Sequence, residues 1–166
     1  MRAELYWIPE TEHGRMAIMP RPRAGDWLED EIRQLRVAGV DVVISLLTYE
    51  EVVELGLEGE SQVCRDNQVE FVSFPIADRH VPESQVDTVK MVKAICEWLK
   101  QNKGVSIHCR MGIGRSALIA ACVLVRQGYA PDDAFEAISK ARRAEVPDTV
   151  EQHDWVSLLA ASIVTQ

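Results

Sequence analysis

The sequence predicts an α/β fold in which a central, mostly parallel sheet is flanked by helices. Two observations lead to this fold class. Short apolar runs rich in β-branched residues alternate with longer stretches in which apolar residues recur at helical spacing. The chain then ends in helical patterns with no further strand. Strands that alternate with helices favour a parallel sheet with helices packed on its faces.

Five short segments carry the strand pattern and are bounded by turn residues. They are 5–8, 16–19, 41–47, 69–74 and 105–108. The first two lie on either side of a turn at His13 and Gly14. The run 41–47 has the continuous apolar character of a buried strand. The run 105–108 is expected to be the central strand.

Six segments carry the helical pattern: 26–37, 48–55, 84–101, 116–127, 131–142 and 149–163. Asp26, Thr48 and Ser84 are expected to cap three of them, because short polar side chains accept hydrogen bonds from the free N–H groups of a first turn. Thr48 and Glu51 also fit the capping-box pattern. Pro131 is typical of a first helical position.

Two helices are expected to bury apolar residues in the core. On the segment 84–101 the inward-facing residues are expected to be Val86, Val89, Val92, Ile95 and Leu99. The helix after Arg115 is apolar almost throughout, from Ala117 to Val125, which predicts a central, buried position. Burial of that helix would hold the loop before it in a fixed shape.

Composition limits the class of protein. The 166 residues suffice for a real core, and residues 1–166 are expected to form a single compact domain, with a monomer favoured. The net charge of -8 and the pI of about 5.0 argue against a nucleic-acid partner. No apolar run approaches the roughly 20 residues of a membrane span, so integral membrane association is not expected.

The amino-terminal residues and the cysteines bear on location. The first residues lack the layout of a signal peptide. The four cysteines form no paired motif, which favours a reducing compartment. The predicted location is the cytoplasm.

The segment 108–116, His-Cys-Arg-Met-Gly-Ile-Gly-Arg-Ser, is the most informative stretch of the chain. It places a nucleophile, two glycines and a fixed positive charge between a predicted strand and a predicted helix. A tight loop that leads into a helix N-terminus is a natural anion site. Loop amides, the helix N-terminus and Arg115 would all favour the thiolate of Cys109, which is the nucleophilic form. The same groups suit the oxygens of a transferring phosphoryl group.

Each position of this loop has an expected task. Arg115 offers a planar fork that can hold two phosphate oxygens. Gly112 and Gly114 let the backbone turn inward, and Ser116 can donate its hydroxyl to the sulfur. The residues expected to bind the phosphate are Arg110, Met111, Gly112, Ile113, Gly114 and Arg115. The alternative is that Cys109 is an inert buried thiol and the glycines only form a turn.

These residues resemble the motif of the Cys-x5-Arg protein phosphatases, particularly the dual-specificity group of the cyclin-dependent-kinase-associated type. The resemblance runs from about residue 39 to 155 and rests on the blocks 74–82, 108–116 and 149–152. It implies a protein tyrosine phosphatase-like fold. It also implies hydrolysis of phosphate monoesters through a phosphocysteine intermediate, on a phosphoprotein or phosphopeptide substrate. Phosphotyrosine is favoured, with phosphoserine and phosphothreonine as further substrates.

Asp78, Gln152 and His108 complete the expected site. Asp78 follows a predicted strand, and ligands of α/β sheets gather at the carboxyl ends of strands. The resemblance assigns Asp78 as the acid that protonates the leaving oxygen and then as the base for water. It also implies that Gln152 orients that water, whereas His108 is expected to support the loop through ring hydrogen bonds. The alternatives are a turn-capping Asp78 and a surface Gln152.

No metal and no cofactor are expected, because the histidines show no metal-ligand spacing and Arg115 with the loop amides supplies the positive potential. One alternative function uses the same chemistry on a phosphoinositide or a small molecule. Two others are a phosphate-binding module without catalysis and a rhodanese-like sulfur transfer, in which Asp78 would have no task.

The remaining cysteines raise a redox hypothesis. An oxidisable thiolate can form a disulfide with a second cysteine, and the candidates are Cys64, Cys96 and Cys122. Cys64 is favoured because it lies just before the strand that leads to Asp78. The alternative is that all three are small buried hydrophobic residues.

Overall fold

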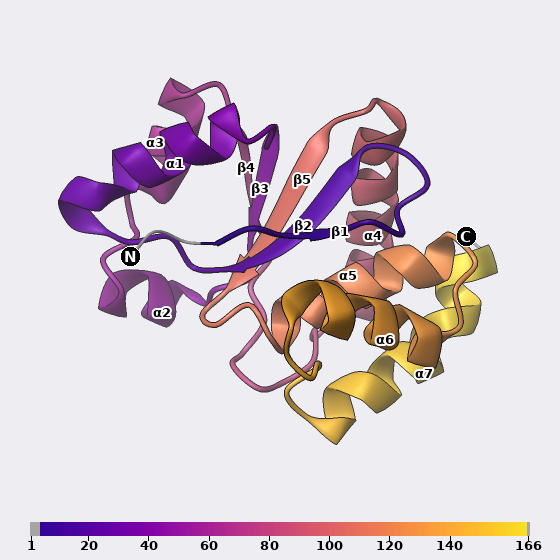
Figure 1. The fold of residues 1–166 in the computed structure, drawn as a ribbon. Helices are drawn as coiled ribbons and strands as arrows, with labels where there is room; N and C mark the ends of the chain where they lie inside the picture. Colours follow the sequence, from indigo (N-terminus) through magenta and orange to yellow (C-terminus); the bar gives the residue numbers. More distant parts are fainter. Residues whose placement is uncertain (1–3, 166) are drawn as a thin grey trace.

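A five-stranded sheet with the order β1-β2-β5-β3-β4 organises the chain (Figure 1). The computed structural model describes residues 4–165. The strands are β1 (Tyr6–Ile8), β2 (Arg15–Pro20), β3 (Val42–Ser45), β4 (Glu70–Ser73) and β5 (Gly104–Cys109). Strand β1 pairs antiparallel with β2, and the other pairs are parallel. The predicted α/β class, the mostly parallel sheet and the central place of the strand before Cys109 are confirmed.

The helices follow the predicted order with one addition. They are η1 (Gly25–Trp27), α1 (Leu28–Val37), α2 (Tyr49–Glu54), α3 (Glu60–Asp66), α4 (Gln85–Lys100), α5 (Arg115–Arg126), α6 (Pro131–Arg142) and α7 (Val150–Thr165). Helix α3 was not predicted, because its seven residues are too few to show a clear apolar period. The Thr48 capping box and the Ser84 cap are confirmed.

Two details of the predicted helices are wrong. Asp26 lies inside the 3-10 turn η1, and α1 begins at Leu28 with no side-chain cap on Trp27. A 3-10 turn before a helix uses backbone bonds for the free N–H groups that a cap would otherwise satisfy. Val86 is 65% exposed although it was expected to face inward. It lies in the first turn of α4, before the helix reaches the core.

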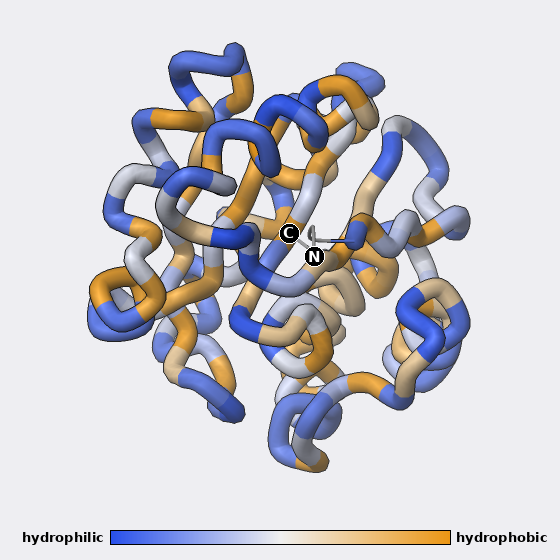
Figure 2. The backbone as a smooth tube through the Cα atoms, turned by 60° about the vertical axis from the view of Figure 1, so that its left-hand side comes forward, coloured by the Kyte–Doolittle hydropathy of each residue, from blue (hydrophilic) through white to orange (hydrophobic). Residues whose placement is uncertain are grey.

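Helices cover both faces of the sheet (Figure 1). Helices α4, α5, α6 and α7 share one core cluster with one side of the sheet, whereas α1 and α3 share a second cluster with the other side. Figure 2 shows hydrophobic segments along the inner strands and helices and hydrophilic ones on outer turns. Among residues 4–165, no helix combines the length and apolar character needed to cross a membrane.

Helix α5 lies at the centre of the larger cluster. Every residue from Arg115 to Val125 is buried, which confirms the expectation from its apolar sequence. The helix packs against α4, α6, α7 and β5. Because all its sides are covered, its N-terminus has a fixed position relative to the end of β5.

Candidate active site

The candidate site lies where β5 ends and α5 begins, at the carboxyl edge of the sheet. Cys109 is the last residue of β5, and residues 110–114 form the loop that leads to Arg115 at the start of α5. Gly112 has φ +70°, and a Cβ there would lie 2.5 Å from the carbonyl carbon of Met19. The tight turn of the loop against β2 therefore requires glycine at this position.

Two groups of the loop and helix contact the sulfur of Cys109. The backbone N–H of Gly112 donates to Sγ at 3.3 Å, and Ser116 Oγ lies 3.4 Å from Sγ. Cys109 itself is only 3% exposed. The sulfur thus sits among polar hydrogens at the N-terminal end of a buried helix, where negative charge is stabilised.

Arg115 is buried and held from two sides. Its two terminal nitrogens donate to the two oxygens of Glu51 at 2.7 and 2.9 Å. One of them also donates to the carbonyl of Ile76 at 2.8 Å, and the other lies 3.1 Å from Asp78 Oδ1. Desolvation lowers the pKa of Arg115, but its bonds to Glu51 and the charge at Cys109 raise it above its ordinary value. The guanidinium is therefore a permanent, oriented cation.

Glu51 is a site residue that sequence reasoning missed. Burial raises its pKa, but the hydrogen bonds from Arg115 and from the Thr48 backbone outweigh burial and lower the pKa from 4.5 to about 2. The sequence identified Glu51 only as half of a capping box. One feature of the sequence could have pointed to Glu51 as a site residue. It follows β3, whose carboxyl end adjoins that of β5.

Asp78, the predicted proton donor, lies on the segment after β4. Its side chain is 56% exposed, faces Arg115 and lines the same pocket as Cys109. Arg79, the next residue, has φ +62° and pairs with Asp148 at 3.0 Å. The structure therefore brings the predicted nucleophile, arginine and acid together.

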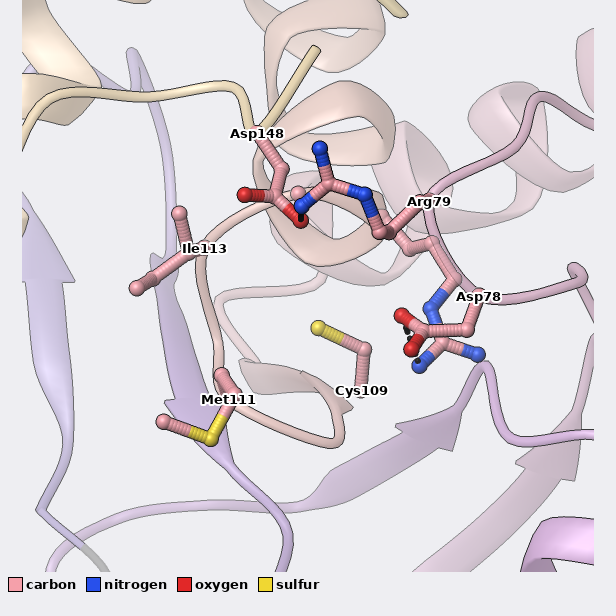
Figure 3. A pocket seen from close by; sticks show the side chains of 8 residues that line it. Asp78, Arg79, Cys109, Met111, Ile113 and Asp148 are labelled. Atoms are coloured by element: carbon pink, nitrogen blue, oxygen red, sulfur yellow. Dashed lines mark hydrogen bonds and ion pairs between the residues drawn. The ribbon is translucent and has the colours of Figure 1, made fainter.

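The pocket has a volume of about 70 Å³ and is lined by Asp78, Arg79, Cys109, Met111, Ile113, Gly114, Arg115 and Asp148. In Figure 3, the Cys109 sulfur lies between the loop that carries Met111 and Ile113 and the segment that carries Asp78 and Arg79. Asp148 reaches the pocket from the α6–α7 connection and was not predicted. A pocket this small suits one phosphoryl group and the first atoms of its ester.

The side chain of Arg110 does not line this pocket. It reaches α2 instead, where it lies 3.4 Å from Glu51 and 3.1 Å from Glu54. The side chain of Arg110, which was expected to bind the phosphate, is therefore paired with α2 and does not reach the pocket. Its charge is neutralised by two carboxylates that had no visible link to the loop in the sequence. Only the backbone of Arg110 remains part of the loop.

His108 is buried next to the loop and makes two ring contacts. Its Nε2 lies 2.7 Å from Glu60 Oε1, and both residues are buried. Its Nδ1 lies 3.4 Å from the carbonyl of Cys109. Glu60 comes from the unpredicted helix α3, so this partner could not be found from the sequence.

Gln152 is buried and packs against the loop without lining the pocket. Its Oε1 accepts from the backbone N–H groups of Asp148 and Thr149 at 3.1 and 3.2 Å, and its Nε2 donates to the carbonyl of His80 at 3.1 Å. A Cβ on Gly114 would lie 3.0 Å from Oε1. Gln152 thus joins the loop, the segment after Asp78 and the start of α7. It is not a surface residue.

Arg142 braces the loop from α6 and was also missed. It donates to the carbonyls of Gly112 and Met111 at 3.0 and 3.2 Å. Its guanidinium also stacks over the ring of Tyr6 at 4.1 Å. These bonds tie the carbonyls of Gly112 and Met111 to α6, while the N–H of Gly112 donates to Cys109 Sγ.

The other cysteines are free and lie away from Cys109. Cys64 belongs to the core cluster on the opposite side of the sheet. Cys96 lines a hollow with His13 and Gln127, near the amino end of β5. Cys109 is at the other end of this strand, and a strand of six residues is about 20 Å long. Cys122 follows Arg115 by two helical turns, about 10 Å. A disulfide needs Cα atoms within about 7 Å, so the structure does not bring any of the three to Cys109.

Burial also keeps these thiols protonated. It raises the pKa of Cys122 to about 12, and with the charge of Glu60 it raises the pKa of Cys64 to about 12. Burial raises the pKa of Cys96 as well. The reading of all three as small buried hydrophobic residues agrees with this placement. Within residues 4–165, no group of three or more His, Cys, Asp or Glu residues could hold a metal ion.

Comparison with known proteins places this site in a family. Residues 17–129 match the family model described as "Polymorphic toxin system, DSP-PTPase phosphatase". The chain therefore belongs to the family of dual-specificity and protein tyrosine phosphatases, as the motif predicted.

Two curated relatives illustrate the similarity. Protein 197R of Invertebrate iridescent virus 6, named as a tyrosine phosphatase, is 32% identical over 161 residues, which cover 95% of this chain and 57% of the relative. Cyclin-dependent kinase inhibitor 3 of Rattus norvegicus is 22% identical over 131 residues, which cover 78% of this chain and 61% of the relative. The chain thus spans less than two thirds of the length of each relative.

Solved structures share the fold. A kinase associated phosphatase, solved with its catalytic-site cysteine changed to serine, matches with a TM-score of 0.90 at 16% identity, over 100% of this chain and 98% of that chain. PTPMT1 in complex with PI(5)P matches with a TM-score of 0.75 at 20% identity, over 98% of this chain and 97% of that chain. These neighbours confirm the predicted protein tyrosine phosphatase-like fold.

Proposed function

We propose that this chain is a cysteine-dependent phosphatase that hydrolyses phosphate monoesters through a phosphocysteine intermediate. The observation that carries the proposal is one pocket lined by Cys109, Arg115 and Asp78. A thiol, a fixed guanidinium and a carboxyl group are the three parts that phosphoryl transfer to sulfur needs. No metal or cofactor is part of the proposal.

In the first step the thiolate of Cys109 attacks phosphorus. The S–P bond forms, the bond from phosphorus to the ester oxygen breaks, and Asp78 gives its proton to that oxygen. Arg115 and the loop amides from Arg110 to Gly114 bind the other phosphate oxygens. Asp78 reaches the leaving oxygen because it stands at the open side of the pocket, whereas Arg115 is buried. Phosphate binding at Arg115 would replace its contact with Asp78 and free the acid for this transfer.

In the second step water attacks the phosphocysteine. Asp78, now ionised, takes a proton from the water as the O–P bond forms and the S–P bond breaks. Ser116 stabilises the departing sulfur, from which it lies 3.4 Å away. We assign Gln152 to positioning this water through the segment that carries Asp78, because its amide bonds to the carbonyl of His80.

The proposed substrates are phosphoproteins or phosphopeptides, with phosphotyrosine favoured over phosphoserine and phosphothreonine. The name of the viral relative supports tyrosine phosphatase activity. The proposed setting is the cytoplasm, where a thiolate nucleophile stays reduced. A monomer is favoured, and a nucleic-acid partner is not proposed for a chain with net charge -8.

The test is turnover of p-nitrophenyl phosphate and a phosphotyrosine peptide without added metal. Cys109→Ser should abolish turnover of both. Asp78→Asn should lower the rate on the peptide by about 10²–10⁴ and less on p-nitrophenyl phosphate, whose leaving group needs little protonation. Cys96→Ala is the matched control, because Cys96 lies outside the pocket, and it should keep wild-type turnover. Turnover that survives in Cys109→Ser would overturn the mechanism.

A further inference from the structure

Asp148 stands out because it puts a second carboxylate into the wall of a phosphate pocket. It lines the pocket together with Cys109, and a Cβ on Gly114 would lie 2.8 Å from its Cβ. Its backbone N–H is fixed by Gln152 at 3.1 Å. In Figure 3 its carboxylate meets the guanidinium of Arg79, with which it pairs at 3.0 Å. This carboxylate therefore bears on which phosphate substrates the proposed pocket accepts.

The charges of the lining are balanced in pairs. The lining contains two arginines, and each pairs with a carboxylate of the same lining: Arg115 with Asp78 at 3.1 Å and Arg79 with Asp148 at 3.0 Å. A single phosphate can take the place of Asp78 on Arg115. Arg79 is then not free to bind a second phosphate, because its charge is balanced by Asp148.

Two of the arginines next to the lining, Arg110 and Arg142, are also engaged. Arg110 is paired with Glu51 and Glu54, and Arg142 donates hydrogen bonds to two loop carbonyls. A second phosphate, with a charge of about -1.5 to -2, would meet the carboxylate of Asp148 with no unmatched cation in the pocket wall. Repulsion between Asp148 and a second phosphate would disfavour ligands with two phosphates relative to ligands with one.

We infer that Asp148 is a specificity-determining residue that restricts this pocket to substrates with one phosphate and excludes those with a second phosphate nearby. The inference rests on the proposed function and deepens it. The substrate class is a singly phosphorylated peptide. Doubly phosphorylated segments and polyphosphorylated inositol rings are rejected at the wall formed by Asp148 and Arg79.

The test compares kcat/KM for two peptides of one sequence. One carries phosphotyrosine alone, and the other carries an additional phosphothreonine two residues away. The wild-type protein should prefer the singly phosphorylated peptide. Asp148→Asn keeps the shape and an acceptor for Arg79 but removes the charge, and it should reduce this preference about tenfold. Arg79→Gln removes the neutralising cation and should move the preference in the opposite direction.

The control is Glu145→Gln, which removes the same charge from the same connection at an exposed position outside the pocket lining. It should leave the preference within about twofold of wild type, because Glu145 is exposed to solvent and does not line the pocket. The wild-type preference should also fall as salt is raised, more steeply than that of Asp148→Asn. Thermal unfolding of each variant checks that it is folded.

Several outcomes would overturn the inference. One is an unchanged preference in Asp148→Asn, and another is an equal effect of Glu145→Gln. A wild-type preference for a water-soluble phosphatidylinositol bisphosphate over the singly phosphorylated peptide would do so too. If the wild-type protein turns over neither peptide nor p-nitrophenyl phosphate, the proposed function fails, and the inference fails with it. Turnover of the singly phosphorylated peptide with no effect of Asp148 overturns the inference alone.

Discussion

At the scale of single residues, one carboxylate orients Arg115, the arginine that we propose binds the phosphate. Glu51 accepts hydrogen bonds from both terminal nitrogens of Arg115 and is itself almost fully buried. A buried ion pair that loses one partner leaves an uncompensated charge, which costs more than the pair contributed. Arg115 therefore depends on Glu51 for its direction, and Glu51 depends on Arg115 for its ionisation.

Glu51→Gln should lower both stability and turnover. We expect a loss of about 3 kcal/mol in the free energy of unfolding at neutral pH, because Arg115 keeps its charge without its partner. The pKa of Glu51 is lowered from 4.5 to about 2 in the folded protein, so its contribution is present above pH 4.5 and is lost as pH falls towards 2. The difference between the two proteins should therefore shrink over that range in urea unfolding. Glu50→Gln, exposed on the same helix, is the control. A difference that persists at low pH would contradict this assignment.

The residues of the loop could be predicted because their task is local, whereas Asp78 and Gln152 follow only from the resemblance to the phosphatase family. Cys109, Gly112 and Arg115 lie within one loop, and their spacing carries the chemistry. Glu51 and Arg115 are 64 positions apart, and Arg79 and Asp148 are 69 apart. Such pairs form only because strands and connections meet at one edge of the sheet. A single sequence contains no spacing that would reveal them.

At the scale of elements, the loop between β5 and α5 is fixed from two sides. The buried helix α5 holds its end, and α6 holds its outer carbonyls through Arg142. Helix α6 was predicted with its bounds, because Pro131 marks its start and its apolar period is regular. Its contact with the loop was not predicted, since a terminal arginine usually serves only the end of its own helix.

Arg142→Gln should loosen the loop. Two charge-assisted hydrogen bonds to loop carbonyls would be lost, and the amides that face the pocket would be less well directed. We expect kcat/KM for p-nitrophenyl phosphate to fall about tenfold. Lys140→Gln removes the same charge from an exposed position of the same helix and should have little effect. Equal losses in the two variants would show that only net charge matters.

At the scale of the whole molecule, one sheet joins two core clusters. Trp7 packs against one cluster, and Trp98 and Trp155 pack against the other. We propose that residues 1–166 form a single domain, because both clusters use the same strands. The sequence could predict the sheet and most helices from their periodicity. It could not predict α3, whose helical state depends on packing against α1 and β4.

This proposal predicts one cooperative unfolding transition. Tryptophan fluorescence reports on both clusters, and far-ultraviolet circular dichroism reports on the helices. In urea the two signals should give the same midpoint, as expected when both clusters unfold together. Two separate midpoints would indicate that the clusters are independent units.

The capping box of α2 has a consequence beyond the helix it begins. The same Glu51 oxygen that accepts from the Thr48 backbone also accepts from Arg115. Thr48, which does not line the pocket, is thus linked through Glu51 to Arg115 in the candidate active site. If the proposed function holds, a change at Thr48 would affect the proposed reaction as well as the stability of α2, and engineering of this turn would have to keep both.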